Sequence, residues 1–367
     1  MHANPKRACT TKLRPWSSAV LELPLTDLLE YPWLEATWQT LLRSDDTHHC
    51  LLLSGRAGIG KTALAVELAQ HLLCEDPSGQ SSCQCCPSCH LVSSSLHPDL
   101  HVLIPQALVE HSHPILQVHA QRYLESHQST QKRKPSRQIS VDSTRMLSES
   151  LLTTVVTSGR KVALIIGADG MNHNAANAML KVLEEPTPGT RFILVSSYPY
   201  RLPATIHSRC IRLDSPTPSQ ESAARWIESR HDIDPDELGL LLRSGLGPLE
   251  LDQIIGDKSA ASICQLIRYF TASDTKAADS LSLAALCAKI GAGRALSILQ
   301  SVALAVIRES VEGHSRSKSV SDGVFGNRKL AIAAFRQLGL ARERFNGPVD
   351  EQLSLEDICS RLCAPRL

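Results

Sequence analysis

The chain has 367 residues, a length that predicts two or three domains. Hydrophobic residues make up 43% of it and charged residues 20%, a composition that indicates a folded, soluble protein and excludes general disorder. The 38 basic and 37 acidic side chains leave a net charge of +1, so no overall field draws the chain to nucleic acid or to an anionic membrane. No apolar run approaches the roughly 18 residues that cross a bilayer, and the N-terminus lacks the apolar region of a signal peptide. We therefore expect a cytoplasmic protein without membrane contact.

The first half of the chain alternates between predicted helices and strands. Residues 1–20 are polar and basic, and we expect them to be flexible. Helical spacing in YPWLEATWQTLL predicts a helix that begins near Pro32, HHCLLLSG predicts a short buried strand, and KTALAVELAQHLL predicts the next helix. HPDLHVLIP then predicts a second strand. Residues 106–138, whose core SHQSTQKRKPSRQ is basic and poor in apolar residues, are predicted to be a mobile insertion, with a nucleic-acid contact as the alternative.

The alternation continues to about residue 213. ISVDSTRMLSESLLTTVV predicts a helix capped by Asp142 or Ser143, and RKVALIIGAD is the clearest buried strand of the chain. The helix in NAANAMLKVLEEP ends before Pro186, and TRFILVSS predicts another strand. Strands that alternate with helices predict a parallel α/β sheet. Beyond this region the chain is rich in Leu and Ala and helical in period, with a Ser-rich break near residue 315, so we expect helices only.

A glycine-rich segment follows the first predicted strand. Residues 55–62, GRAGIGKT, match the P-loop pattern G-x-x-x-x-G-K-[ST], in which backbone N–H groups and the positive end of the next helix face phosphate oxygens. An ordinary glycine-rich turn is the alternative, but the flanking strand and helix are the context that a nucleotide-binding P-loop requires. The residues predicted to contact nucleotide are Gly55, Gly58, Gly60, Lys61, Thr62 and Ala63.

Hydrolysis of a bound nucleotide requires more than the P-loop. A P-loop ATPase holds Mg²⁺ with an acid at the end of a neighbouring strand and usually positions the attacking water with a second acid. In KVALIIGADGMN, Ile166 and Gly167 stand where these acids are expected. Asp169 lies two positions beyond Gly167 and either reaches back to compensate or, as we favour, caps the following turn.

Twelve cysteines are many for a chain in a reducing compartment, where disulfides are disfavoured. Five of them fall within sixteen residues, and Cys74, Cys83, Cys86 and Cys89 form the spacing C-x8-C-x2-C-x2-C. Because two C-x2-C steps bring thiolates together in a tight turn, we predict a closed four-sulfur site that holds a structural Zn²⁺. Cys85 is expected to point away as a free thiol, and unliganded or disulfide-forming cysteines are the alternative.

A P-loop followed directly by a four-cysteine insertion resembles the clamp-loader subunits of bacterial DNA polymerase III, which are AAA+ proteins. The resemblance covers about residues 30–360 and includes ISVDSTR, NAANAMLKVLEEPTPGTRFILVS and RLPATIHSRC. It implies an AAA+ α/β domain over residues 21–213 with a zinc module at 74–89. It further implies a small helical lid over 214–258 and an all-helical collar for oligomerisation over 259–367.

Two branches of this family differ at the strand that lacks acids here. Gamma or tau motor subunits keep the acidic pair and delta-prime subunits commonly lose it, so Ile166 and Gly167 place the resemblance with the delta-prime branch. YPWL near the start, Pro248 where a motor carries a sensor arginine, and Ser196 with Ser197 at a second sensor position agree with this. The resemblance implies binding of ATP and Mg²⁺ without efficient hydrolysis, and no independent catalysis by this subunit of a DNA-directed DNA polymerase holoenzyme.

The same resemblance assigns a role to Arg209. Residues 208–210 match the family's Ser-Arg-Cys motif, whose arginine finger reaches the ATP of a neighbouring subunit and stabilises charge on its γ-phosphate. A surface arginine without a role is the alternative. Glu184 and Glu185 fall near the implied subunit interface and are assigned no chemistry. The implied partners are gamma/tau and delta subunits in a hetero-pentamer and, through that complex, the sliding clamp and primer-template DNA at the replisome.

Two other functions are weighed against a delta-prime-type subunit that helps to load the sliding clamp in chromosomal replication. An ATP-hydrolysing gamma/tau-type motor is disfavoured by Ile166, Gly167 and Pro248. A zinc-stabilised nucleic-acid-binding P-loop protein needs a basic face, but the predicted zinc module CEDPSGQSSCQCCPSCH contains no Lys or Arg. The delta-prime-type reading is therefore favoured.

Overall fold

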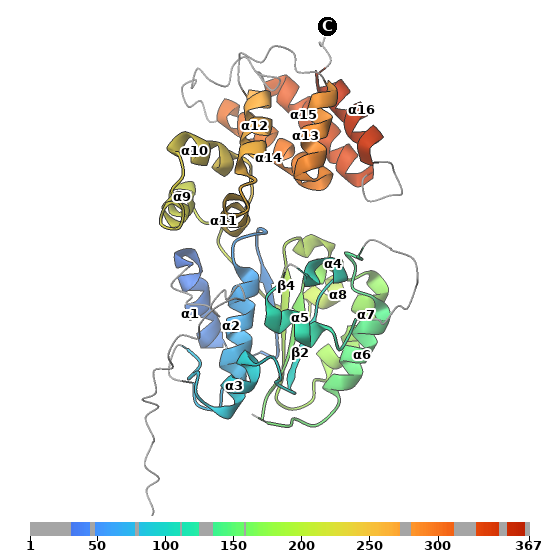
Figure 1. Ribbon diagram of the computed structural model, residues 1–367. Coiled ribbons are helices and arrows are strands. Elements are labelled where there is room, and N and C mark those ends of the chain that lie inside the picture. The colour runs from blue at the N-terminus through green and yellow to red at the C-terminus, as the bar shows by residue number, and fades with distance from the viewer. Residues whose placement is uncertain are drawn as a thin grey trace, which may run out of the picture. The chain divides into compact units, whose positions relative to one another are not determined.

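The computed structural model (Figure 1) describes residues 31–44, 48–77, 81–110, 112–124, 135–157, 159–271, 280–311, 328–344 and 351–363. The chain forms two compact units, residues 1–217 and 218–367. This boundary lies close to residue 213, where the predicted nucleotide-binding domain ends. The first unit contains strands and helices, and the described part of the second contains only helices.

A five-stranded sheet forms the centre of the first unit (Figure 1). Its strands are β1 (Cys50–Ser54), β2 (Leu100–Leu103), β3 (Lys161–Ile166), β4 (Thr190–Ser196) and β5 (Ile211–Asp214). They lie in the order β2-β3-β4-β1-β5, and every pairing is parallel. All residues of β1, β2 and β3 are buried, as expected for parallel strands covered on both faces. The predicted parallel α/β sheet is confirmed.

Helices connect and cover these strands. They are η2 (Pro32–Leu34), α1 (Glu35–Ser44), α2 (Lys61–Leu73), α3 (Pro87–Ser93), α4 (Gln106–Val109), α5 (Pro114–Ala120), α6 (Val141–Leu151), η3 (Ala168–Gly170), α7 (His173–Glu184), η4 (Pro199–Arg201) and α8 (Ala204–His207). Because successive side chains of a strand point to opposite faces, Leu52, Ile165 and Leu194 share a face, where they form a core with α6, α7 and α8. Helix α2 packs against β1, β3 and β4 with a separate set of buried side chains.

The second unit is helical throughout its described residues. Its helices are α9 (Gln220–Glu228), α10 (Pro235–Arg243), α11 (Pro248–Gly256), α12 (Ala260–Thr271), α13 (Ser280–Ile290), α14 (Ala292–Val311), α15 (Arg328–Arg344) and α16 (Glu351–Cys363). Helix α10 packs against α12, α13 against α16, and α14 against α15. The predicted lid and collar helices therefore belong to one compact unit, and their division at residue 258 stays a prediction. The Ser-rich break near residue 315 lies outside the described residues.

None of the described helices has by itself both the length and the apolar character that a membrane span requires. Helices α13 and α14 reach that length and apolar character only as a pair, and the pair is bent by 110°.

The predicted N-cap of α6 is wrong. The cap is Ser140 rather than Asp142 or Ser143, because the Ser140 hydroxyl accepts the backbone N–H of Ser143 at 3.0 Å. Ser140 also has the extended backbone, with φ −75° and ψ 158°, that an N-cap residue usually adopts.

Part of the predicted mobile insertion at residues 106–138 is folded. It contains α4 and α5, and Ile115 and Leu116 of α5 are buried where this helix packs against β2. The Tyr123 hydroxyl, beyond α5, shares a 2.5 Å hydrogen bond with Nδ1 of His101 on β2. The scattered apolar residues of this segment were therefore sufficient to cover the sheet edge. Most of its basic core falls on residues 125–134, outside the described residues.

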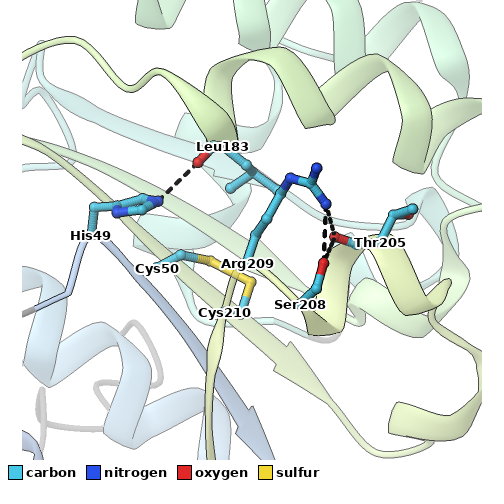
Figure 2. Close-up of a disulfide and its surroundings, with 7 residues drawn as sticks. All are labelled: His49, Cys50, Leu183, Thr205, Ser208, Arg209 and Cys210. Carbon is cyan, nitrogen blue, oxygen red and sulfur yellow. Dashed lines mark hydrogen bonds between the residues drawn. A yellow bond between two sulfur atoms is a disulfide. The ribbon is translucent and has the colours of Figure 1, made fainter.

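A disulfide joins Cys50, the first residue of β1, to Cys210, which immediately precedes β5 (Figure 2). The two strands pair in parallel with Leu51 opposite Ile211, so the preceding residues lie side by side with Cα atoms 4.7 Å apart. The structure differs here from the expectation that disulfides are disfavoured. The disulfide forms because the strand register brings together two cysteines that are 160 residues apart in sequence.

A buried carboxylate ties the edge strand β2 to the segment that leads into β3. Asp99, 1% exposed, accepts the backbone N–H of Val156 at 2.9 Å, and the N–H and hydroxyl of Thr157 at 2.9 and 2.6 Å. Burial alone would raise the pKa of Asp99, but these hydrogen bonds outweigh burial and hold the pKa below its usual value. The ionised carboxylate is therefore a stabilising part of the fold.

We predict that Asp99→Asn lowers the free energy of unfolding at pH 7 by about 2–3 kcal/mol, because an amide N–H₂ then meets backbone donors. A carboxyl whose folded pKa is lowered stabilises the fold above its unfolded pKa of about 3.9, and this contribution is lost as pH falls through the folded value. The difference between the two proteins should therefore shrink below about pH 4. Urea and thermal unfolding followed by circular dichroism measure both effects.

The matched control for this prediction is Asp142→Asn, because Asp142 is an exposed carboxylate paired with the exposed Arg145. This control should unfold like the wild type. Equal unfolding midpoints for the wild type and Asp99→Asn at pH 7 would contradict the stabilising role of Asp99.

Candidate functional site

The P-loop between β1 and α2 has the backbone conformation that glycine permits. Gly55, Gly58 and Gly60 have φ values of +149°, +71° and +94°, which residues with a Cβ atom rarely adopt. A Cβ atom at Gly55 would lie 2.9 Å from the carbonyl oxygen of Ser215, so the loop also passes close to the end of β5. The three glycines therefore allow a tight turn directly before the N-terminus of α2, which is the arrangement that binds phosphate.

The segment YPWL supports the P-loop from outside. The indole Nε1 of Trp33 donates to the carbonyl oxygen of Ile59 at 2.8 Å, and Ile59 is fully buried. A Cβ atom at Gly60 would lie 3.0 Å from a methyl group of Leu34 and 3.6 Å from the ring of Tyr31. From the sequence, YPWL indicates a helix start and a resemblance to the delta-prime branch, whereas in the structure this segment also packs against the P-loop.

Lys61 is the buried charged side chain of the P-loop. It is only 5% exposed, and its Nζ donates to the carbonyl oxygen of Arg56 at 2.5 Å and to the hydroxyl of Ser197 at 3.3 Å. Thr62 and Ala63 follow in the first turn of α2 and are partly exposed. If a phosphate were placed here, its charged oxygens would replace the carbonyl of Arg56 and the hydroxyl of Ser197 as acceptors for Lys61, and hydrogen bonds to charged oxygens are stronger.

The end of β3 carries no acid, as the sequence indicates. Ile166 is buried, and Gly167 has a φ of +63°. The prediction that Asp169 caps the following turn is wrong, because its Oδ1 accepts the hydroxyl of Ser196 at 2.7 Å and the N–H of Ser197 at 3.1 Å. Asp169 therefore binds the end of β4, and Ser197 links it to Lys61.

Four cysteine side chains converge between the end of α2 and the start of α3. The Sγ atoms of Cys74, Cys83, Cys86 and Cys89 all lie within 4.8 Å of one another, with 4.0 Å between Cys74 and Cys86 and between Cys83 and Cys89. A tetrahedral site with metal–sulfur bonds of 2.3 Å separates its sulfurs by about 3.8 Å. This four-cysteine group could therefore hold a metal ion.

Backbone N–H groups point at the sulfurs of this group. The N–H groups of Cys83, Cys86 and Cys89 donate to the Sγ atoms of Cys74, Cys83 and Cys86, each at 3.3 Å. Burial raises the pKa of Cys74 and Cys89. Burial also acts on Cys83, but hydrogen bonds from the backbone of Cys85 and Cys86 outweigh it and lower the pKa of Cys83 to about 6.

Arg209 lies two residues beyond the end of α8 (Figure 2), and its side chain is partly exposed. Its Nη1 donates to the carbonyl oxygen of Thr205 at 2.8 Å and to the hydroxyl of Ser208 at 3.0 Å. Its Nη2 forms an ion pair with Glu184, the last residue of α7. Sequence reasoning assigned no chemistry to Glu184, since nothing in the local pattern indicates a partner 25 residues away.

The P-loop and Arg209 lie at opposite ends of the parallel strands, called here the carboxyl edge and the amino edge of the sheet. The P-loop follows the carboxyl end of β1, as Ser197 follows that of β4. Arg209 precedes Cys210, which is bonded to Cys50 at the amino end of β1. A strand rises about 3.3 Å per residue, so roughly 16 Å separates Cys50 from Gly55 along β1. The structure therefore brings Lys61 together with Ser197 and leaves Arg209 at the other edge.

Comparisons with known proteins point to one family. The family described as DNA polymerase III, delta subunit, matches residues 32–218, just over half of the chain. The DNA polymerase III subunit delta' of Pseudomonas aeruginosa is 36% identical over 62% of this chain and 61% of its own length. Proteins of that name from Escherichia coli and Bacillus subtilis are 30% and 31% identical over 65% and 62% of this chain, and over 66% and 60% of their own lengths.

The matched region thus spans less than two thirds of each of these relatives. The family match over residues 32–218 contains the sheet, the P-loop, the four-cysteine group and Arg209. Because the family match covers more than half of it, the chain belongs to the DNA polymerase III delta-subunit family, and the three relatives named above are delta' subunits.

Proposed function

We propose that this chain is a non-motor, delta-prime-type subunit of a DNA polymerase III clamp loader, acting in the cytoplasm at the replisome. It completes a ring with gamma/tau and delta subunits, and the complex loads the sliding clamp onto primer-template DNA. The observation that carries the non-motor role is the end of β3, where Ile166 and Gly167 occupy the positions of the acids that a hydrolysing P-loop ATPase needs. Family membership supports the choice of complex.

Nucleotide binding at the P-loop is part of this proposal. The groups that would hold the phosphates are Gly55, Gly58, Gly60, Lys61, Thr62 and Ala63. They fit phosphate because the glycine backbone turns tightly before α2 and the ammonium of Lys61 already points into the loop. Bound ATP with Mg²⁺ would supply a γ-phosphate to Lys61 and an ion to the hydroxyl of Thr62. Asp169 is engaged by β4, so it does not replace the missing acids of β3.

We predict that Lys61→Ala lowers the affinity of the isolated chain for Mg²⁺ and the non-hydrolysable analogue AMP-PNP by about tenfold or more, because a charged donor to phosphate is lost. ATP turnover by the isolated wild-type chain should be no faster than turnover by this variant. Calorimetric titration and a phosphate-release assay measure the two quantities.

Lys181→Ala is the control for this experiment, because Lys181 is an exposed lysine on α7. Its affinity for AMP-PNP should equal that of the wild type. Equal affinity of the wild type and Lys61→Ala would remove the P-loop from nucleotide binding. Strong turnover by the isolated chain would favour a gamma/tau-type motor instead.

The four-cysteine group is proposed to hold a structural Zn²⁺. Four thiolates are soft ligands that favour zinc, and a site with four protein ligands leaves no open position for catalysis. The separations of the sulfur atoms fit a tetrahedral ion, and the N–H groups directed at three of them stabilise thiolates. The ion would join the end of α2 to the start of α3.

We predict about one zinc per purified chain, measured by plasma mass spectrometry. Cys83→Ser should remove most of this zinc and lower the melting temperature by at least about 4 °C, because the link between α2 and α3 is lost. Cys85→Ser is the matched control and should keep the zinc, since Cys85 is not one of the four converging sulfurs. Undiminished zinc in Cys83→Ser would contradict the site.

Arg209 is proposed to act on ATP bound by a neighbouring subunit. It lies at the amino edge of the sheet, separated from its own P-loop by roughly 16 Å of strand, so its own nucleotide is out of reach. A partly exposed guanidinium suits the charge that spreads over a γ-phosphate during transfer. The finger would therefore serve hydrolysis in trans.

We predict that Arg209→Ala, in a complex reconstituted with motor and delta subunits, lowers clamp- and DNA-stimulated ATP turnover by at least about tenfold, mainly in kcat. Arg145→Ala is the control, because Arg145 is an exposed arginine of α6 that pairs with Asp142. Size-exclusion chromatography confirms that each complex has assembled. Normal turnover by an assembled Arg209→Ala complex would exclude the finger role.

A further inference from the structure

The backbone around Arg209 is fixed on two sides. The N–H of Arg209 donates to the carbonyl oxygen of Ile206 at 3.1 Å. The next residue, Cys210, is bonded to Cys50 at the start of β1 (Figure 2). The remaining freedom at this position is therefore that of a long arginine side chain, whose rotamers span many directions. Some contact must select one of them if the guanidinium is to meet a phosphate at a fixed place.

Glu184 supplies that contact from a fixed element. It is the last residue of α7, and the residues before it, Val182 and Leu183, are buried. The carbonyl oxygen of Leu183 is also within hydrogen-bond distance, 2.8 Å, of Nε2 of His49, which lies next to β1 (Figure 2). The carboxylate of Glu184 therefore holds Nη2 of Arg209 from an anchored helix end.

The charges at this helix end also favour the pair. A carboxylate at the C-terminus of a helix is disfavoured by the negative end of the helix dipole, and a guanidinium beside it offsets that cost. The pair is made by Glu184 and not by the adjacent acid Glu185. This difference makes Glu185 a matched control for any role of Glu184.

The contacts leave part of the guanidinium available. The acceptors Thr205, Ser208 and Glu184 engage at most three of the five N–H groups of Arg209, and only Nη1 and Nη2 are used. A bidentate bond to a phosphate oxygen pair needs two N–H groups. Arg209 can thus be held by its own chain and still present donors outward.

We propose that Glu184 is a positioning residue that fixes the guanidinium of Arg209 for the γ-phosphate of a neighbouring subunit's nucleotide. This inference rests on the proposed function of Arg209. Glu184 touches no reacting atom, and it acts by limiting the directions in which the finger points. Orientation of this kind lowers the barrier of the chemical step more than it strengthens substrate binding, so its loss appears in kcat.

The test uses the reconstituted complex with motor and delta subunits. Glu184→Ala should lower kcat for clamp- and DNA-stimulated ATP turnover about tenfold with little change in KM, because the guanidinium loses its orientation. Glu184→Gln keeps one acceptor without the charge and should fall between Glu184→Ala and the wild type. Glu185→Gln should match the wild type. In the double variant Glu184→Ala with Arg209→Ala, turnover should equal that of Arg209→Ala alone.

Each other outcome overturns the inference in a recognisable way. If Arg209→Ala retains full turnover, the proposed finger fails and the positioning role fails with it. If Arg209→Ala loses turnover but both Glu184 variants keep it, the positioning role alone fails. Faster turnover by Glu184→Ala would make Glu184 a restraint on the finger. If Glu184→Ala has a lower melting temperature but a normal kcat per assembled complex, Glu184 makes only a structural contact and the positioning role fails.

Discussion

Parallel pairing of β1 with both β4 and β5 is the constraint on which the candidate sites depend. Because all strands run in one direction, their carboxyl ends gather at one edge of the sheet and their amino ends at the other. The carboxyl edge carries the P-loop and Asp169, and the amino edge carries the Cys50–Cys210 disulfide and Arg209. Open α/β sheets bind ligands outside the carboxyl ends of their strands. In the proposed complex, the amino ends of the strands would therefore face a partner, and a nucleotide bound by this chain would lie at their carboxyl ends.

The carboxyl ends of the strands carry the groups proposed to bind phosphate, and β3 ends in Ile166 and Gly167 rather than in acids. Burial of a lysine is costly, and Lys61 is accommodated because the carbonyl oxygen of Arg56 and the hydroxyl of Ser197 accept hydrogen bonds from its ammonium. Asp169 orders Ser196 and Ser197 at the end of β4. The proposed phosphate binding would thus depend on β1 and α2, whereas hydrolysis would depend on β3. The lack of acids at the end of β3 need not disturb the P-loop.

The sequence predicted the features that depend on neighbouring residues. The strand-glycine-helix pattern identified β1, the P-loop and α2, whose bounds Lys61–Leu73 equal the predicted helix, and the cysteine spacing identified the converging sulfurs. Contacts between distant segments could not be predicted, because periodicity does not encode strand order or register. Asp169 and Ser196 are 27 residues apart, Cys50 and Cys210 are 160 apart, and Glu184 and Arg209 are 25 apart. The helices inside residues 106–138 were missed because few apolar side chains suffice at a sheet edge.

The distance between the P-loop and Arg209 allows the two proposed roles to be independent of each other. Groups more than about 10 Å apart without shared partners usually contribute independently. The presence of Ile166 and Gly167 in place of acids therefore need not disturb Arg209. The backbone of Arg209 is held by a hydrogen bond to Ile206 and by the disulfide at the next residue. A nucleotide at the P-loop would then stabilise the fold by its binding free energy instead of driving a chemical step on this chain. In the proposed complex, bound nucleotide would add to the stability of this subunit, and ATP hydrolysis by the neighbouring subunit would require Arg209.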